Sequence, residues 1–501
     1  MLPTDYIQRM KELLKDEYED YLRSFEIKSY KALRLNPLQA DEARLLALLE
    51  KPDIVNGALN GGEKPERVPW EPFGYYYDDG AKPGVSPYHE AGAYYIQEPS
   101  AMKPVTMMEW HKTEDIPKLR VLDLCAAPGG KTTQIASYMK GRGVLVCNEY
   151  VPQRARILSQ NIERMGVRNA IVINETPASL KDVFISYFDR ILVDAPCSGE
   201  GMFRKNPEAV NEWSSDNVDM CAGRQDEILD CAAMMLKPGG IMVYSTCTFS
   251  PQEDEECISR FINRHPDYEL VGMEKLYPHK VKGEGHFAAE LKRSGEAHDG
   301  YCTKGTVDGT IFSEFISGNG NAARDVKNTS AGKRVMGKNG QGNGKSAVKQ
   351  ALRSDFLKGI IREESLKFSD GGCAWGDGKL VFFGDNIYLV PMDAPGFDGL
   401  RVLRPGLQLG TLKKDRFEPA HALALAIGSE DAERTVDITY DEAKAYLAGM
   451  SITLTGDESD VNGEMDNGWC LVCLDGLSLG WGKITGNVVK NHYPKGLRKQ
   501  A

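Results

Sequence analysis

The sequence has no apolar run long enough to cross a membrane. A transmembrane helix needs about 18 or more consecutive apolar residues, and no stretch of the chain approaches that length. The opening segment MLPTDYIQRMKELLKDEYEDYL also lacks the apolar centre and the small-residue cleavage site of a secretory signal. Its charged, amphipathic pattern predicts a helix with Thr4 as the N-cap. We therefore expect a cytoplasmic protein with no membrane-bound part.

The cysteines lack the spacing of a disulfide framework. The chain has 11 of them, an odd number, and they are scattered. The pair in CLVC, residues 470–473, has zinc-like spacing but no second pair of ligands nearby, so no metal site is expected. Thiols stay reduced in the cytoplasm, and most of these cysteines are expected to be small core residues.

The chain also lacks the net positive charge that is typical of general nucleic-acid binders, since its formal net charge is −11. The charge is segregated, however. From residue 483 to the end the chain has no acid and carries the cations Lys483, Lys490, Lys495, Arg498 and Lys499. A basic tail on an acidic body can bind a polyanion or form a solvated end. The composition leaves both open.

The length of 501 residues predicts roughly two to four domains. In the middle of the chain, strand-like and helix-like segments alternate. Strands are predicted at residues 120–125, 143–149, 170–174, 190–196 and 241–247. Helices are predicted from about Lys131, over 152–165, and over a long segment that stops at Gly239 and Gly240. This alternation predicts an α/β fold with a doubly wound parallel sheet and helices on both faces.

The alternation ends near Gly305. Residues 305–352 are rich in Gly, Asn, Ser and Lys and have almost no large apolar side chains. Such a segment cannot bury enough surface to offset the entropy of ordering it, so we predict a flexible linker. Beyond it, residues 379–391 and 469–484 are strand-like and predict a small β-rich module.

A glycine-rich turn, DLCAAPGGKTT at residues 123–133, follows the first predicted strand. It ends like a phosphate-binding loop, but Cys125 holds the position of the first glycine, which must let the backbone curl around phosphates. We favour a nucleoside cofactor, because small residues allow close backbone approach and Glu149, about twenty residues on, can bind ribose hydroxyls. These small residues are Ala126, Ala127, Gly129 and Gly130. The alternative is an ordinary α/β turn.

Two cysteines follow two of the predicted strands. Cys197 lies in DAPCSGEG and Cys247 lies in STCTFSPQEDEE. Both belong at the carboxyl edge of the sheet, where ligands bind. Ser250 and Glu253 are predicted to form a capping box that starts the next helix, with Pro251 at its first position. The helix N-terminus favours a thiolate, whereas the acidic run that follows opposes one.

Two thiols and a carboxylate beside a methyl donor suit the methylation of cytosine at C5. This carbon is a poor nucleophile until a thiolate adds to C6. Asp194 can hold N3 and the exocyclic amine, and a second group can assist product release. The Asp/Asn-Pro-Pro-aromatic motif of amino-adenine methyltransferases is absent, and DAPC stands in its place. The alternative is that Cys197 and Cys247 are buried structural residues.

Several other candidate residues are expected to be structural. The cysteines expected in the core are Cys125, Cys147, Cys221, Cys231 and Cys257. His279 and His286 are interpreted as loop residues without a catalytic role.

The chain resembles the RNA cytosine-5 methyltransferases of the Nol/Nop/Sun family in LDLCAAPGGKTTQIA, DAPCSGEGMFRKNPEA and YSTCTFSPQEDEE. KALRLNPLQA and GAYYIQEPSAM resemble the family's segments before the catalytic domain. YPHKVKGEGHFAAELKR and GWGKITGNVVKNHYPKGLRK resemble its bacterial branch called ribosomal RNA small subunit methyltransferase F, which carries a C-terminal PUA-like RNA-binding module. The resemblance covers most of the chain apart from the predicted linker.

This resemblance implies a Rossmann-like class I methyltransferase that uses S-adenosylmethionine and modifies RNA, with ribosomal RNA as the expected target. Cys247 matches the nucleophile, Cys197 matches the cysteine that helps to release the product, and Asp194 matches the acid of the fourth motif. The implied cofactor residues are Cys125, Ala126, Ala127, Pro128, Gly129, Gly130, Lys131, Glu149 and Asp194. The family's usual aspartate near the adenine is missing, and either Glu175 or Thr176 stands in for it.

Three questions stay open at this point. DNA cytosine-5 methyltransferases use a Pro-Cys cysteine as nucleophile, which would favour Cys197 over Cys247. The target could be transfer RNA, or the chain could be a non-catalytic RNA-binding assembly factor; DNA is not expected. Phe203, Arg204 and Lys205 are either RNA contacts or part of a solvated loop.

The predicted domain limits follow from these features. Residues 1–104 form an N-terminal RNA-contacting segment and residues 105–300 form the catalytic domain. The linker at 305–352 is followed by an intermediate α/β module at 353–430 and the PUA-like module at 431–501.

Overall fold

The computed structural model describes residues 2–51, 54, 65–112, 115–296, 298, 300–311, 357–362, 365, 378–413, 416–454 and 467–499. Within these ranges, no helix is both long enough and apolar enough to span a bilayer.

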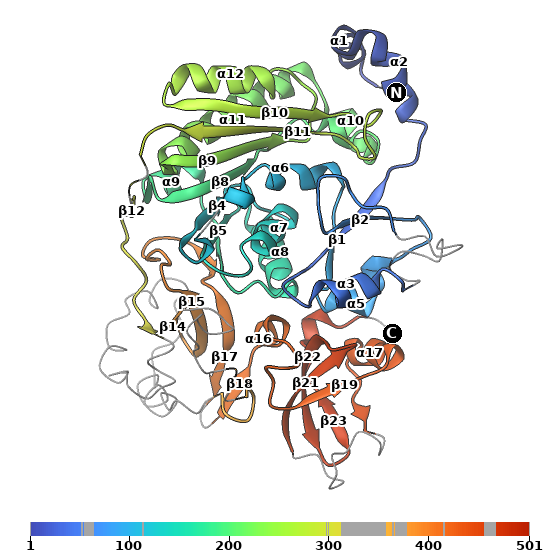
Figure 1. Ribbon diagram of the computed structural model, residues 1–501, viewed down its shortest axis with the longest axis vertical. Helices are drawn as coiled ribbons and strands as arrows, with labels where there is room; N and C mark the ends of the chain where they lie inside the picture. The colour runs from blue at the N-terminus through green and yellow to red at the C-terminus, as the bar shows by residue number, and fades with distance from the viewer. Residues whose placement is uncertain are drawn as a thin grey trace.

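An eight-stranded sheet with the order β10-β11-β9-β8-β4-β5-β6-β16 forms the centre of the molecule (Figure 1). Its parallel strands are β4 (Arg120–Asp123), β5 (Val144–Asn148), β6 (Ala170–Ile173), β8 (Phe188–Asp194) and β9 (Leu236–Thr246). The antiparallel strands at its two edges are β10 (Tyr268–Leu276), β11 (His286–Arg293) and β16 (Val402–Arg404). The predicted α/β class and the five predicted strands are confirmed. The prediction that Gly239 and Gly240 stop the long helix is wrong, because both lie inside β9.

Alternating side chains of the central strands bury against helices on opposite faces. Leu122 and Val146 pack in one apolar cluster with α9 (Pro177–Lys181), α11 (Ser215–Met235) and α12 (Glu255–Arg264). Val121 and Leu145 pack in another with α7 (Gly130–Tyr138) and α8 (Pro152–Arg164). Since successive strand residues point to opposite faces, the continuous apolar runs of these strands require cover on both sides.

The N-terminal part packs against this core through both its first helices and its small sheet. It contains α1 (Thr4–Leu14), α2 (Tyr18–Ser24), α3 (Glu42–Leu48), α5 (Pro87–Glu90) and α6 (Lys103–Thr106), and a small sheet of β1 (Lys31–Leu35), β2 (Gly74–Tyr77) and β3 (Tyr94–Ile96). The predicted N-cap is wrong: Thr4 is already helical and Pro3 is the N-cap residue. Tyr6 of α1 packs in an apolar cluster with Phe203 and Trp213 of the catalytic region. Figure 1 shows α1 and α2 beside that end of the sheet.

Arg34 of β1 joins the N-terminal sheet to helix α7. Its side chain is fully buried. The guanidinium donates to the carbonyl of Gly130 at 3.2 Å, to Oγ1 of Thr133 at 2.7 Å and to Oε1 of Gln97 at 3.1 Å. Burial lowers the pKa of Arg34 to about 10, so the side chain stays charged at neutral pH. The first turn of α7 is therefore held from outside the central sheet.

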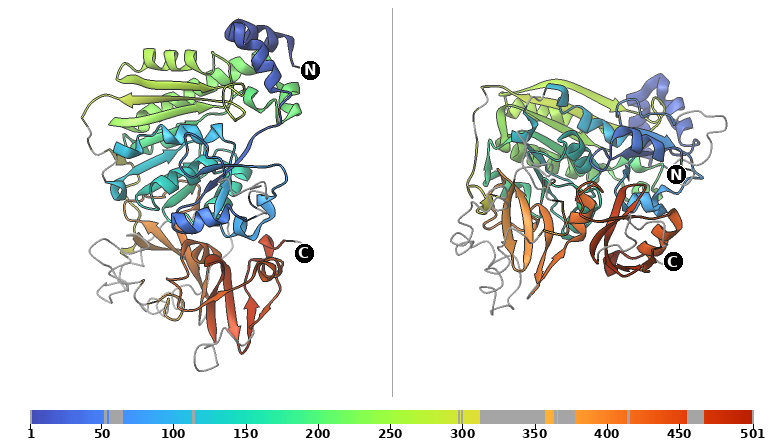
Figure 2. Two further views of the ribbon diagram at one scale, coloured as in Figure 1. Left: turned by 45° about the vertical axis from the view of Figure 1, so that its right-hand side comes forward. Right: turned by 60° about the horizontal axis from the view of Figure 1, so that its bottom comes forward.

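Two further sheets lie side by side near the β16 end of the molecule (Figure 2). One has the order β13-β14-β15-β17-β18, with β13 (Thr310–Ile311), β14 (Gly378–Phe383), β15 (Asn386–Pro391), β17 (Leu407–Lys413) and β18 (Arg416–Pro419). The other has the order β19-β21-β22-β23-β20, with β19 (Thr435–Asp437), β20 (Ile452–Thr453), β21 (Gly468–Leu474), β22 (Leu477–Thr485) and β23 (Val488–Asn491). Helices α16 (His421–Ala426) and α17 (Tyr440–Leu447) complete this part, and a short pair, β7 (Phe184–Ile185) with β12 (Tyr301–Cys302), precedes it.

The first residues of the predicted linker are ordered in strand pairs. Val307 is buried, and β13 pairs with β14. Assigning residues 305–311 to a flexible linker is therefore wrong, and residues 312–352 lie outside the described ranges. Cys470 and Cys473 are buried in β21. The remaining domain limits stay predictions.

The network of Arg34 predicts a loss of stability. Arg34→Ala leaves buried acceptors of α7 unpaired and opens a cavity, and we expect a loss of about 2–3 kcal/mol in the free energy of unfolding. Thermal or urea unfolding measures this loss. Arg23→Ala is the control, because Arg23 is exposed and its ion pair with Asp20 contributes about 0.5 kcal/mol or less. Equal stability of the two variants would contradict the assignment.

Candidate active site

A cavity of about 820 Å³ opens at the carboxyl edge of the central sheet. The loops that follow β4, β5, β6, β8 and β9 line it, together with one face of α11 and the residues just before and at the start of β11. The carboxyl edge is where ligands bind in open α/β sheets. The three stretches singled out in the sequence therefore meet at one place.

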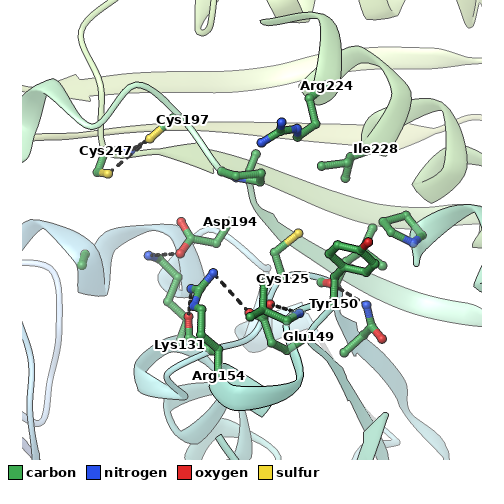
Figure 3. Close-up of a pocket in the computed structure, with 18 of the residues that line it drawn as sticks. Cys125, Lys131, Glu149, Tyr150, Arg154, Asp194, Cys197, Arg224, Ile228 and Cys247 are labelled. Atoms are coloured by element: carbon green, nitrogen blue, oxygen red, sulfur yellow. Dashed lines mark hydrogen bonds and ion pairs between the residues drawn. The ribbon is translucent and has the colours of Figure 1, made fainter. Parts of the chain in front are cut away.

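The two cysteine sulfurs lie side by side in this cavity (Figure 3). Sγ of Cys197 is 3.2 Å from Sγ of Cys247. The backbone N–H of Cys247 points at Sγ of Cys197, with 3.4 Å between the two heavy atoms. The hydrogen bond with Cys247 and burial both raise the pKa of Cys197. At neutral pH Cys197 therefore keeps its proton and can donate it toward the neighbouring sulfur.

The residues around the cysteines fasten the two loops together. Oγ of Ser198 lies 2.8 Å from Oγ1 of Thr248, and the backbone N–H of Gly201 donates to the carbonyl of Cys247 at 2.8 Å. The buried carboxylate of Glu253 accepts from the backbone N–H of Ser198 at 2.9 Å and also from its hydroxyl. These bonds fix the separation of the two sulfurs.

The predicted capping box is wrong. Helix α12 begins at Glu255, and its N-cap is Asp254. Oγ of Ser250 donates to the side chain of Gln252, while Glu253 turns toward the loop of Cys197. The spacing Ser-x-x-Glu matches a capping box, but the acid instead accepts from Ser198, on the loop that follows β8.

Asp194 is held as a carboxylate at the same edge. Nζ of Lys131 lies 2.8 Å from Oδ2 of Asp194, and Oγ of Ser245 donates to Oδ1 at 2.8 Å. Although burial opposes ionisation, the charge of Lys131 and the proximity of His286 hold the pKa of Asp194 well below its usual range. Lys131 therefore neutralises an acid of this cavity, a role different from that of a phosphate-loop lysine.

His286 is the main residue that the sequence analysis missed. The sequence favours a loop residue without a catalytic role, but His286 is the first residue of β11, is only 4% exposed and lines the cavity. Its Nε2 lies 3.6 Å from Oδ1 of Asp194. His279 does lie in a turn, near Glu17 of the N-terminal part. Only the alternation in HFAAELKR could have indicated a strand beginning at His286.

The glycine-rich turn presents its backbone to the cavity. Cys125, Ala127 and Lys131 line it, whereas the other small residues of the turn, Ala126, Pro128, Gly129 and Gly130, are not among its lining residues. Gly129 has φ +112°, a left-handed conformation that favours glycine. Burial raises the pKa of Cys125, so it remains a neutral thiol.

Glu149 and Thr176 line the cavity, whereas Glu175 does not. Glu149 accepts from the backbone N–H of Val151 at 2.8 Å and lies 3.4 Å from a guanidinium nitrogen of Arg154. Glu175 accepts from the backbone N–H of Arg401 at 2.9 Å and pairs with its guanidinium at 3.3 Å. Of the two candidates for the adenine side, Thr176 is the one at the cavity.

One face of α11 also lines the cavity and was not predicted to do so. Its residues are Arg224, Glu227, Ile228 and Cys231, which follow helical spacing. In Figure 3, Arg224 and Ile228 lie across the cavity from Lys131 and Arg154. Cys231, expected to be a core residue, is buried and yet reaches the cavity wall.

The stretch Phe203–Lys205 attaches the N-terminal helices. The ring of Phe203 is buried, and its centroid lies 5.0 Å from the centroid of the Tyr6 ring. The side chain of Arg204 is also buried, and it lies 3.5 Å from the carboxylate of Glu284. Both expectations for Phe203 and Arg204, an RNA contact or a solvated loop, are therefore wrong. Lys205 is exposed, and its RNA contact stays a prediction.

Family models match four consecutive parts of the chain. Residues 2–99 match the N-terminal domain of 16S rRNA methyltransferase RsmF, and residues 111–292 match 16S rRNA methyltransferase RsmB/F. Residues 363–427 match the first C-terminal domain of RsmF rRNA methyltransferase, and residues 433–499 match the methyltransferase RsmF PUA domain.

Curated relatives match over nearly the whole chain. A ribosomal RNA small subunit methyltransferase F of Shewanella piezotolerans is 31% identical over 86% of this chain and 85% of its own length. A protein of the same name from Vibrio vulnificus is 30% identical over 99% of this chain and 97% of its own length.

Among solved structures, that of PH0851 has a TM-score of 0.51 and 28% identity, covering 58% of this chain and 66% of that chain. Together with the cavity at the carboxyl edge of a Rossmann-like sheet, these matches lead to one conclusion. The chain belongs to the ribosomal RNA small subunit methyltransferase F family, and it is an S-adenosylmethionine-dependent methyltransferase.

Proposed function

We propose that this protein methylates C5 of a cytosine in small-subunit ribosomal RNA through a covalent bond between Cys247 and C6 of the base. The observation that carries the proposal is the pair of sulfurs 3.2 Å apart, in the same cavity as Asp194 and the glycine-rich turn at residues 123–133. The names of the relatives, which refer to small-subunit ribosomal RNA, support the choice of substrate.

The chemistry requires an activated ring. When bound, S-adenosylmethionine supplies an electrophilic methyl group. Attack of the Cys247 thiolate on C6 breaks the C5–C6 double bond and makes C5 nucleophilic. We assign this attack to Cys247 because Cys197 keeps its proton and can donate a hydrogen bond to a neighbouring thiolate. Because Sγ of Cys197 lies 3.2 Å from Sγ of Cys247, Cys197 is better placed to assist the release of the product than to attack the base itself.

Release of the product requires two bonds to break. The C5 proton leaves to a base, and the bond between C6 and Cys247 breaks with its electron pair returning to sulfur. We propose that Cys197 assists this step, since it touches the departing sulfur. Asp194 remains ionised and accepts from the exocyclic amine of cytosine.

The proposed cofactor residues suit an adenosyl group. Glu149 offers a carboxylate to ribose hydroxyls, and Thr176 and Ile228 provide walls for a flat ring. Cys125 and Ala127 bring the backbone close to the ligand. We place this activity in the cytoplasm, where reducing conditions keep the free cysteines active.

The two acids at strand ends give a test of the cofactor site. We expect Glu149→Gln to weaken S-adenosylmethionine binding about 10–100-fold, because a charge-assisted hydrogen bond to the ribose is lost. Glu175→Gln is the matched control, and its dissociation constant is expected within about threefold of the wild type, since Glu175 faces Arg401. Calorimetric titration measures both. A larger loss for Glu175→Gln would overturn the assignment.

The two cysteines are predicted to fail in different ways. We expect Cys247→Ala to lose methyl transfer by about 10³-fold or more and to form no protein–RNA adduct. Cys197→Ala should instead accumulate an RNA-linked protein on a denaturing gel, because the bond to Cys247 forms and is not released. The buried Cys257→Ala, away from the cavity, is the control. The reverse pattern would make Cys197 the nucleophile.

Bisulfite sequencing of ribosomal and transfer RNA from a deletion strain identifies the substrate. We expect one 5-methylcytosine to disappear from small-subunit ribosomal RNA and to return when the wild-type gene is restored. A mark lost only from transfer RNA would indicate a transfer-RNA enzyme. No lost mark in either pool would indicate a non-catalytic assembly factor.

A further inference from the structure

His286 occupies a fixed position at the edge of the catalytic cavity. It pairs with Leu276 at the end of the β10–β11 ladder, and the next residue, Phe287, pairs with Thr246 of β9. This register places His286 beside the end of β9, which Cys247 follows directly. Strand β8, which carries Asp194, is the next neighbour of β9.

The backbone before His286 is held by the N-terminal part. The N–H of Glu284 donates to the carboxylate of Glu98 at 2.8 Å, and the N–H of Gly285 donates to Oγ of Ser100 at 3.0 Å. Gly285 has φ +112°, and a Cβ there would lie 2.4 Å from the ring of Phe249. This approach therefore requires glycine, which leaves the imidazole little freedom to move.

Nε2 of His286 is buried and makes no hydrogen bond to the described residues; the acceptor it faces, Oδ1 of Asp194, is 3.6 Å away. A buried nitrogen without a hydrogen bond is unfavourable, and here it borders a cavity. The charged groups around it are Lys131 of α7, Asp194 of β8 and Glu98 of the N-terminal part. Burial and the charge of Lys131 lower the pKa of His286, against the opposite effect of the two carboxylates. The ring is therefore neutral at neutral pH and has one N–H to donate.

We propose that His286 and Asp194 together recognise the Watson–Crick edge of the target cytosine, with the Nε2–H of His286 donating to N3 and Asp194 accepting from the exocyclic amine. This inference rests on the proposed function. Nε2 of His286 and Oδ1 of Asp194 are 3.6 Å apart, which is close enough for one to bind N3 of cytosine while the other binds the adjacent exocyclic amine. Uracil would be disfavoured at both positions. Its N3–H would face the Nε2–H donor of His286, and its O4 acceptor would face the carboxylate of Asp194.

The same hydrogen bond stabilises the addition step. When the sulfur of Cys247 bonds to C6, the C5–C6 π pair moves to the C4–C5 bond and the C4–N3 π pair moves onto N3. Negative charge therefore develops on the atom that faces Nε2–H. When C5 then takes the methyl group, that pair returns to the C4–N3 bond. A hydrogen bond donated to N3 is stronger in this transition state than in the ground state, so it raises the turnover rate.

Three substitutions test the proposal on small ribosomal subunits from the deletion strain, with 5-methylcytidine measured by mass spectrometry. His286→Phe keeps a flat ring without a donor, and we expect kcat to fall about 100-fold. His286→Gln keeps an N–H and is expected within about tenfold of the wild type. S-adenosylmethionine affinity should stay within about twofold for both. His286→Leu repeats the donor-free test without the bulk of an aromatic ring.

His421→Phe is the matched control. His421, a half-buried histidine of α16 away from the cavity, also has a buried ring nitrogen without a hydrogen-bond partner among the described residues, and its substitution should leave kcat unchanged. Wild-type kcat in His286→Phe or His286→Leu would overturn the inference. So would equal losses in His286→Gln and His286→Phe, or a matching loss of cofactor affinity, which would indicate a purely structural role. If the wild type itself formed no 5-methylcytidine, the proposed function would fail as well.

Discussion

The parallel pairing of β8 with β9 is the constraint on which the site depends. Asp194 pairs with Ser245 in this ladder, so the loops that follow the two strands leave the sheet side by side. Cys197 and Cys247 lie just beyond this pair, and the bonds among Ser198, Thr248 and Glu253 hold their loops together. A shift of one residue in the register would turn one cysteine away from the other. The proximity of the two sulfurs is therefore a consequence of strand pairing.

The central sheet and the position of the candidate site at its carboxyl edge could be predicted from the sequence, because apolar runs and glycine-rich turns are local signals. Prediction failed where a contact joins distant residues. Glu253 matched a capping pattern, but its partner Ser198 lies on another loop. Glu175 and Thr176 could not be separated, since Arg401, which engages Glu175, lies far along the chain. His286 was missed because the antiparallel strand β11 falls outside the alternation of strands and helices.

Parts of the chain outside the catalytic sheet contribute to each half of the cavity. Arg34 of β1 holds the first turn of α7, next to the cofactor turn. Arg9 of α1 pairs with the buried carboxylate of Glu200, which also accepts from the indole N–H of Trp213 at 2.8 Å. Glu98 fixes the backbone ahead of His286. The N-terminal part therefore contacts both the residues next to the glycine-rich turn and those next to His286 and the loop of Cys197.

The C-terminal part also contributes to the core, because its strand β16 belongs to the central sheet. This strand comes from residues far along the chain, and yet it pairs with β6 and closes that edge of the sheet. An enzyme fragment that stopped after the last helix and strand of the methyltransferase unit would leave the backbone of β6 bare. Bare edges recruit foreign strands and promote aggregation. Expression of a minimal catalytic fragment therefore calls for a substitute strand or a redesigned, charged β6.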